Sequence, residues 1–116
     1  MTNASFRITR DKLVEVLTDA VPWEPDWRTL KKIDLRARQL ESCIALSEHL
    51  PHVQEVWLDH NQVSFAMGIP SSVRLLTASH NVMSELTSFE HLKRLRVLDV
   101  CHNEFASLMP FVHLTE

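Results

Sequence analysis

A cysteine, a histidine and an asparagine stand side by side as Cys101, His102 and Asn103, within the stretch DVCHNEF. A thiol beside an imidazole can act as a nucleophile with its base, and both groups are also zinc ligands. On a strand, however, successive side chains point to opposite sides, so this thiol and this imidazole need not meet. Nothing in the sequence indicates an oxyanion hole or a pocket, which disfavours a Cys/His enzyme.

The same kind of stretch recurs at regular intervals along the chain. LKKIDLRARQL, VQEVWLDHNQV, VRLLTASHNVM and LRVLDVCHNEF begin at residues 30, 53, 73 and 95, so they are spaced 23, 20 and 22 residues apart. All four fit L-x-x-L-x-L-x-x-N-x-L with apolar exchanges, and this is the leucine-rich repeat, whose period is ~20–29 residues. Asn103 is therefore the asparagine of the fourth repeat, and His102 is equivalent to His60 and His80.

Each repeat predicts one short strand whose side chains alternate between two sides. One side is apolar in every repeat, and a single repeat cannot bury it, whereas stacked neighbours can. The predicted fold is α/β: a leucine-rich repeat solenoid with a short parallel sheet on the concave face and short helical or extended returns on the convex face. The inward residues are Ile33, Leu35, Val56, Leu58, Leu76, Ala78, Leu98 and Val100.

The pattern divides the chain into a cap and an array. Residues 1–29 form an N-terminal cap helix and linker, and residues 30–116 hold four repeats. The repeats are expected at 30–52, 53–72, 73–94 and 95–116. The array is expected to be truncated at the C-terminus, which leaves the last repeat uncovered and predicts self-association through it. Its exposed apolar residues would be Leu98, Val100, Phe105, Leu108 and Phe111.

The segments outside the strands carry weaker signals. A cap helix is expected to start at Thr9 as its N-cap, with Trp23 or Trp27 shielding the first repeat. The return CIALSEHLP predicts a short helical turn that ends before Pro51, and FAMGIPSS predicts an extended return. The return TSFEHLKRL predicts a helix, because Thr87 and Glu90 are spaced as a capping box. The apolar face of the cap helix would be Leu13, Val16, Leu17 and Ala20.

Two columns of polar residues follow from stacking the repeats. Asn61, Asn81 and Asn103 are predicted to form a structural ladder, each amide bonding to adjacent backbone, while the first repeat has Arg38 there. The three histidines should stack about one strand spacing apart, ~5 Å. Such a rigid column can offer imidazoles to zinc, but they converge poorly on the four tetrahedral positions of a structural site. No metal and no cofactor is therefore expected.

Composition excludes several further classes. The net charge of −3 at pH 7 argues against a nucleic-acid or anionic-membrane surface. A single glycine, Gly68, excludes glycine-rich phosphate loops. No apolar run reaches the ~20 residues of a membrane span. Two cysteines do not make a disulfide framework, and no signal peptide is visible, so an intracellular, cytoplasmic setting is expected.

Two long segments carry a more specific likeness. ITRDKLVEVLTDAVPWEPDWRTLKKIDLRARQLES and GIPSSVRLLTASHNVMSELTSFEHLKRLRVLDVCHNEFASL resemble the leucine-rich repeat domain of the fungal septation initiation or mitotic exit network scaffold. The most telling parts are VPWEPDW, GIPSSVR and LTSFEHL, because these are not general repeat consensus. The resemblance implies a non-enzymatic scaffold at the spindle pole body, with protein partners, that anchors a GTPase and kinase cascade.

The sheet itself offers the expected protein-binding surface. Trp57 is the large aromatic of this face and the expected interface anchor, because aromatic side chains carry much of the energy at protein interfaces. A generic intracellular adaptor, or a regulatory subunit such as that of a phosphatase, is the alternative function. The predicted face consists of Lys32, Asp34, Arg36, Glu55, Trp57, Asp59, Leu75, Thr77, Ser79, Val97, Asp99 and Cys101.

Overall fold

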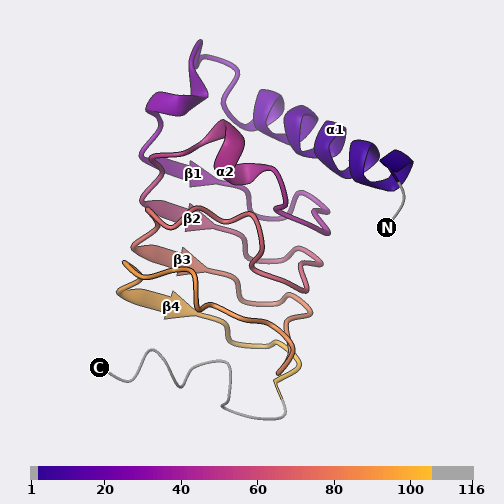
Figure 1. Ribbon diagram of the computed structural model, residues 1–116, viewed down its shortest axis with the longest axis vertical. Helices are drawn as coiled ribbons and strands as arrows, with labels where there is room; N and C mark the ends of the chain where they lie inside the picture. Colours follow the sequence, from indigo (N-terminus) through magenta and orange to yellow (C-terminus); the bar gives the residue numbers. More distant parts are fainter. Residues whose placement is uncertain (1–2, 106–116) are drawn as a thin grey trace.

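The architecture is a ladder of four short parallel strands. The structure, a computed structural model, describes residues 3–105. Its strands are β1 (Lys32–Asp34), β2 (Glu55–Trp57), β3 (Leu75–Thr77) and β4 (Val97–Asp99), and they pair in chain order (Figure 1). Equivalent repeat positions lie side by side, with Ile33 beside Val56, and Leu76 beside Leu98. The fold is α/β with a parallel sheet, an arrangement consistent with the leucine-rich repeat.

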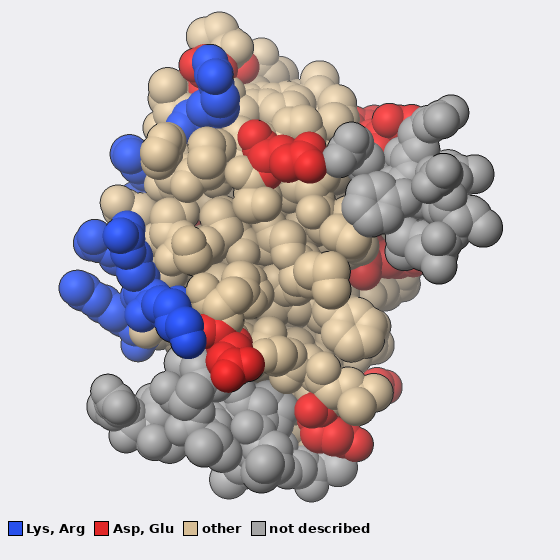
Figure 2. Space-filling model, in the orientation of Figure 1, with Lys and Arg blue, Asp and Glu red and all other residues tan. Residues whose placement is uncertain are grey.

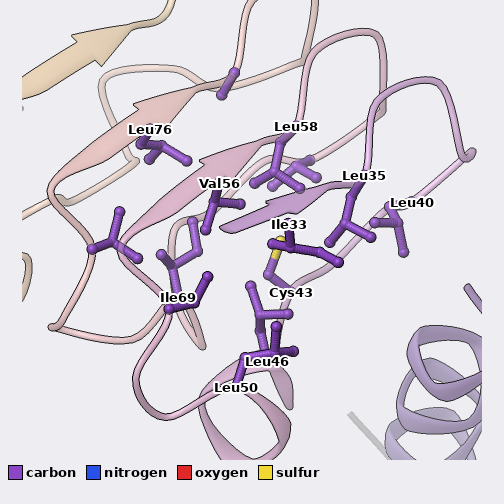
Figure 3. Close-up of a cluster of buried hydrophobic side chains, with 14 of the residues drawn as sticks. Ile33, Leu35, Leu40, Cys43, Leu46, Leu50, Val56, Leu58, Ile69 and Leu76 are labelled. Carbon is purple, nitrogen blue, oxygen red and sulfur yellow. The ribbon is translucent and has the colours of Figure 1, made fainter. Parts of the chain in front are cut away.

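The core lies on one side of this sheet, between the strands and the return segments. The middle residue of each of the first three strands is buried, and Figure 3 shows these side chains pointing toward residues of the returns, such as Leu46 and Ile69. Burying each such side chain contributes ~1.5–3 kcal/mol. Leu98, at the same position of β4, is only half-buried. We call the opposite side of the sheet the outward face and the covered side the return side.

The first two returns follow their sequence signals. The first forms the short helix α2 (Leu46–His49), as predicted, and it ends before Pro51, whose ring cannot continue a helix. The second contains turns at residues 67–68 and 71–72 and no helix. Gly68 adopts φ +93, a left-handed conformation that suits glycine because it has no Cβ.

The prediction of a helix starting at Thr87 is wrong, because residues 85–94 contain three turns and no helix. Thr87 is buried, and its hydroxyl does not cap a helix. It donates to the carbonyl oxygen of Ser64 in the preceding return (2.5 Å) and accepts from the amide of Ser84 (3.1 Å). The Thr87 hydroxyl therefore bonds to the preceding repeat instead of capping a local helix. Phe89 and Leu92 are nevertheless buried in the core, as their spacing indicated.

The cap helix is longer than expected. Helix α1 runs Asn3–Ala20, so Thr9 lies inside it and the prediction of an N-cap there is wrong. Residues 3–8 contain no glycine or proline, so nothing in them stops the helix. Its side chains Leu13, Val16 and Leu17 join the buried cluster of the sheet, as the apolar spacing indicated.

The two tryptophans of the linker behave differently. Trp23 is 73% exposed, so of the two candidates it is Trp27 that packs against the buried cluster. Trp27 begins a short 3-10 helix (Trp27–Thr29), and its ring meets the ring of His49 edge-on at a centroid distance of 5.6 Å. Among residues 3–105 no helix is long and apolar enough to cross a membrane.

Candidate protein-binding face

The pairing register arranges the outward face in three rows that cross all four strands. The first row is Lys32, Glu55, Leu75 and Val97, and the second is Asp34, Trp57, Thr77 and Asp99. The third row, Arg36, Asp59, Ser79 and Cys101, follows the strands by two residues. Adjacent residues of the third row are also linked by backbone hydrogen bonds. The donors are the amides that follow each row residue: Ala37 donates to the carbonyl of Asp59, His60 to that of Ser79, and His80 to that of Cys101.

Ion pairs occupy the first-strand end of the outward face. Lys32 Nζ lies 3.3 Å from Glu55 Oε2, and Arg36 lies 2.8 Å from Asp34 Oδ2. The hydrogen bond from Arg36 holds the pKa of Asp34 below its ordinary value. All four side chains are substantially solvent-accessible, so these pairs contribute little stability. Their effect is to set the charge pattern at this end of the outward face.

Asp59 organises the centre of the outward face, a role that sequence reasoning missed. Its Oδ2 accepts from the hydroxyl of Thr77 at 2.8 Å. Its Oδ1 accepts from both the amide and the hydroxyl of Ser79, each at 2.8 Å. The only signal in the sequence is the register, which sets a hydroxyl residue beside an aspartate on the next strand. The three bonds fix this carboxylate in one orientation.

Trp57, the expected interface anchor, is half-buried rather than fully exposed. It lies on an inner strand, so Asp34 of β1 and Thr77 of β3 flank it as register partners. Val97, at 51% exposure, is the exposed large hydrophobic residue that the strands contribute. The apolar surface of the outward face therefore includes an edge valine as well as the partly covered indole.

The ladder asparagines bond to the backbone of two repeats at once. Asn81 Nδ2 donates to the carbonyls of Leu58 (3.0 Å) and Ala78 (3.0 Å), and its Oδ1 accepts from the amide of Val63 (3.0 Å). Asn61 and Asn103 repeat this arrangement in their own repeats. At the first-repeat position the backbone amide of Arg38 donates to Asn61, and its guanidinium pairs with Asp19 of α1.

The histidines stack as a column. The ring centroids of His60 and His80 are 4.4 Å apart, and those of His80 and His102 are 4.2 Å apart, with nearly parallel planes. All three residues have φ between 55 and 60, a left-handed conformation that histidine tolerates better than most residues. Sequence reasoning found the column but missed this backbone conformation, which Ala37 shares in the first repeat.

The electrostatics of the column differ from those of a metal centre. Desolvation, followed by the neighbouring charges of His102 and His60, lowers the pKa of His80. Parallel rings face each other rather than a common point. Within residues 3–105 no group of three or more His, Cys, Asp or Glu side chains is arranged to hold a metal ion.

Cys101 lacks the surroundings of a nucleophile. Its side chain is exposed, and the hydrogen bond to Asp99 raises the pKa of the thiol. A reactive thiolate requires the opposite shift. The neighbouring imidazole of His102 stacks on His80. Cys43, the second cysteine, is buried in the core, where desolvation raises its pKa to about 12.

Comparison with known proteins gives two relevant relatives. The chain is 37% identical over 98 residues to the septation initiation network scaffold protein cdc11 of Schizosaccharomyces pombe, a match that covers 84% of this chain and 9% of the relative. It is 30% identical over 117 aligned residues to the protein NUD1 of Saccharomyces cerevisiae, which covers 97% of this chain and 14% of the relative.

The other comparisons found nothing. No protein-family model matches the chain, and no solved structure matches it. The chain spans less than a sixth of the length of each curated relative. Over most of its own length, this chain is homologous to one segment of the septation initiation network scaffold cdc11 and to one segment of NUD1.

Proposed function

We propose that this chain is a protein-binding module of a non-enzymatic scaffold that anchors a GTPase and kinase cascade for septation or mitotic exit at the spindle pole body. The similarity to cdc11, which is named a septation initiation network scaffold, carries this proposal. The spindle pole body and the cascade come from the family resemblance in the sequence. The raised pKa of the Cys101 thiol disfavours a thiol nucleophile, because a reactive thiolate requires a lowered pKa.

The fold that serves this function is a leucine-rich repeat solenoid with the outward face on its concave side. Residues 1–29 cap the array, and four repeats follow over residues 30–116 in the division given above. Two features of the described residues support this: the strands share one register, and the asparagine bonds recur from repeat to repeat.

The concave face binds the partner through Trp57. Trp57 precedes Asp59 by two residues on the same face, and its register partner Thr77 donates to that carboxylate, which Ser79 also holds in place. An apolar side chain and an oriented carboxylate are therefore preformed on one face. Asp34 and Asp99 occupy the same row as Trp57. This pattern fits a segment with Lys or Arg next to an apolar anchor, because opposite charges guide and align the encounter.

Replacing Trp57 by alanine in the full-length scaffold tests the proposal. Loss of such an anchor costs ~2 kcal/mol or more, about a thirtyfold loss of affinity. Recruitment of the fluorescently tagged scaffold to the spindle pole, and its binding to isolated poles, are the measurements. Trp23→Ala is the matched control, since this aromatic is 73% exposed and lies in the linker that follows α1, outside the outward face. Normal recruitment of a Trp57→Ala protein with an unchanged circular dichroism spectrum would remove Trp57 from the interface.

Self-association through the last repeat is a separate expectation. Leu98, Val100 and Phe105 are half-buried, whereas equivalent residues of the inner repeats are buried. Leu108 and Phe111, which belong to the same expectation, lie outside the described residues. Sedimentation velocity at several concentrations is the measurement. We expect the average mass to rise with concentration, and a constant monomer mass would contradict this.

A further inference from the structure

An apolar pocket opens between the second and third return segments, on the side of the sheet opposite the outward face. Its volume is about 420 Å³. Three of its side chains are large and exposed: Phe65 (53%), Met67 (64%) and Leu86 (75%). Clustered apolar side chains of this exposure mark interaction sites in folded proteins. The pocket is lined by Phe65, Ala66, Met67, Gly68, Leu86, Ser88 and His91.

The walls of this pocket are fixed by contacts between the two returns. His91 Nε2 donates to the carbonyl oxygen of Ile69 (2.9 Å), and the hydroxyl of Thr87 donates to Ser64 (2.5 Å). Gly68 forms part of the floor, and its backbone packs so closely that an added Cβ would come 2.1 Å from the carbonyl oxygen of Cys43. The pocket is therefore preformed, which lowers the entropic cost of filling it.

A basic pocket of about 380 Å³ lies at the other end of the same return segment. Ser88 and His91 line the apolar pocket, whereas Lys93 and Arg94 line the basic one. Arg74 and Arg96 complete it from adjacent repeats, where the amide of Arg96 donates to the carbonyl of Arg74 (2.7 Å). The two pockets thus share one segment, residues 88–94.

The basic side chains belong to a larger asymmetry of charge. In Figure 2, Lys and Arg gather along the edge where the strands of Figure 1 begin, whereas most Asp and Glu of this view lie elsewhere. None of Arg74, Lys93, Arg94 and Arg96 forms an ion pair with another residue of the described chain. The chain as a whole has a net charge of −3, so this concentration of unpaired cations is local. A negatively charged partner segment would relieve their mutual repulsion.

We propose that this return surface, the apolar pocket together with the four basic side chains, binds an acidic segment of a protein partner. One Phe, Leu or Met of the segment enters the apolar pocket, and neighbouring carboxylates lie against Arg74, Lys93, Arg94 and Arg96. The combination favours a peptide over nucleic acid, which needs a broader basic surface without an apolar anchor point. Since the outward face lies across the sheet, both surfaces can be occupied at once.

Peptide selection tests the proposal directly and requires no identified partner. A phage-displayed library of random peptides of about 16 residues is selected on the purified chain, long enough for an anchor with its flanks. Enriched sequences are synthesised, and their binding is measured by fluorescence anisotropy. We expect enrichment of Asp and Glu around one Phe, Leu or Met, with affinity that falls as salt rises.

Two substitutions and two controls locate the bound peptide. Leu86→Glu and Arg94→Glu each weaken binding by about tenfold or more, because one removes the apolar site and the other reverses a charge. Trp23→Glu and Lys12→Glu, at exposed residues of the cap region, make the same kind of change elsewhere and leave binding within about twofold. All four sites are exposed, so circular dichroism spectra should remain unchanged.

Other results would overturn the proposal. Selected peptides that lack acidic residues around an apolar one would contradict it. Peptide binding that is abolished by Trp57→Ala but unaffected by Leu86→Glu would also contradict it. The latter result would leave the proposed concave-face function standing. Tighter binding to duplex DNA or to phosphatidylserine vesicles than to the peptides, lost in Arg94→Glu, would assign the basic side chains to a different class of ligand.

Discussion

At the scale of single residues, the side chain of Asn81 satisfies backbone groups of two repeats. Asn81→Ala would leave the amide of Val63 and the carbonyls of Leu58 and Ala78 without this partner in a buried setting. We expect the free energy of unfolding to fall by ~1–3 kcal/mol in urea titrations. Glu85→Ala, at an exposed site of the same repeat, is the control. Equal effects of the two substitutions would contradict a structural ladder.

The histidine column predicts sensitivity to mild acid. The folded pKa of His80 lies below its ordinary value, so between the unfolded pKa of ~6.5 and the folded one the unfolded chain binds the extra proton. The contribution of His80 to the free energy of unfolding is therefore fully present above the unfolded pKa and is lost as pH falls below it. Thermal melts between pH 8 and about 5 measure the decline. Replacing His60, His80 and His102 by Gln should flatten the profile, whereas an unchanged slope would exclude the column as its source.

At the scale of the element, Gly68 holds the second return against the first. A Cβ at this position would lie 2.1 Å from Cys43 O and 2.5 Å from the Cα of Ile44, and φ is +93. Both contacts are backbone, so no side-chain rotation relieves them. We expect Gly68→Ala to destabilise the fold by ~2–4 kcal/mol, measured by chemical unfolding. Met67→Ala, at the exposed neighbouring residue, should change stability by ~0.5 kcal/mol or less.

The strands were predictable from the sequence, whereas some of the segments between them were not. Four aligned copies set the register of Ile33, Val56, Leu76 and Leu98, because each copy repeats the same spacing of apolar residues. The spacing of Thr87 and Glu90 indicated a helix, but the hydroxyl of Thr87 found a carbonyl in the preceding return. A local pattern holds no information about such a distant acceptor.

In the candidate site, too, the positions of the residues were predictable from the sequence, whereas their contacts were not. The register placed twelve side chains on the outward face, yet it did not reveal how Asp59 bonds across strands to Thr77 and Ser79. Nor did it reveal that Trp57 is half-buried, since that depends on the bulk of the neighbours along a row. The return-side pocket was missed because Phe65, Met67 and Leu86 come from two segments that no repeat consensus describes.

At the scale of the whole molecule, helix α1 and the sheet share one buried cluster. Leu17 of α1 is fully buried in it, so Leu17→Ala removes core volume at the boundary between cap and first repeat. We expect a loss of ~2–5 kcal/mol in the free energy of unfolding. The half-buried Val14 gives the matched control, whose change to alanine should cost clearly less. Tryptophan fluorescence and far-ultraviolet dichroism should report the same shifted midpoint, and separate midpoints would mean that the cap unfolds independently.

The asparagine bonds described above also determine how the molecule responds to mechanical load. Asn61, Asn81 and Asn103 each fasten one repeat to the one before it, and every strand pairs only with its neighbours in the sheet. A force that pulls α1 and β4 apart therefore acts in series on the asparagine hydrogen bonds and the strand pairing that connect successive repeats. We expect each rupture to release the 20–23 residues that separate successive copies of the motif, or roughly 70–80 Å of chain at ~3.4 Å per residue. Single-molecule force spectroscopy should therefore record extension in steps of this length, and a single long step would contradict it.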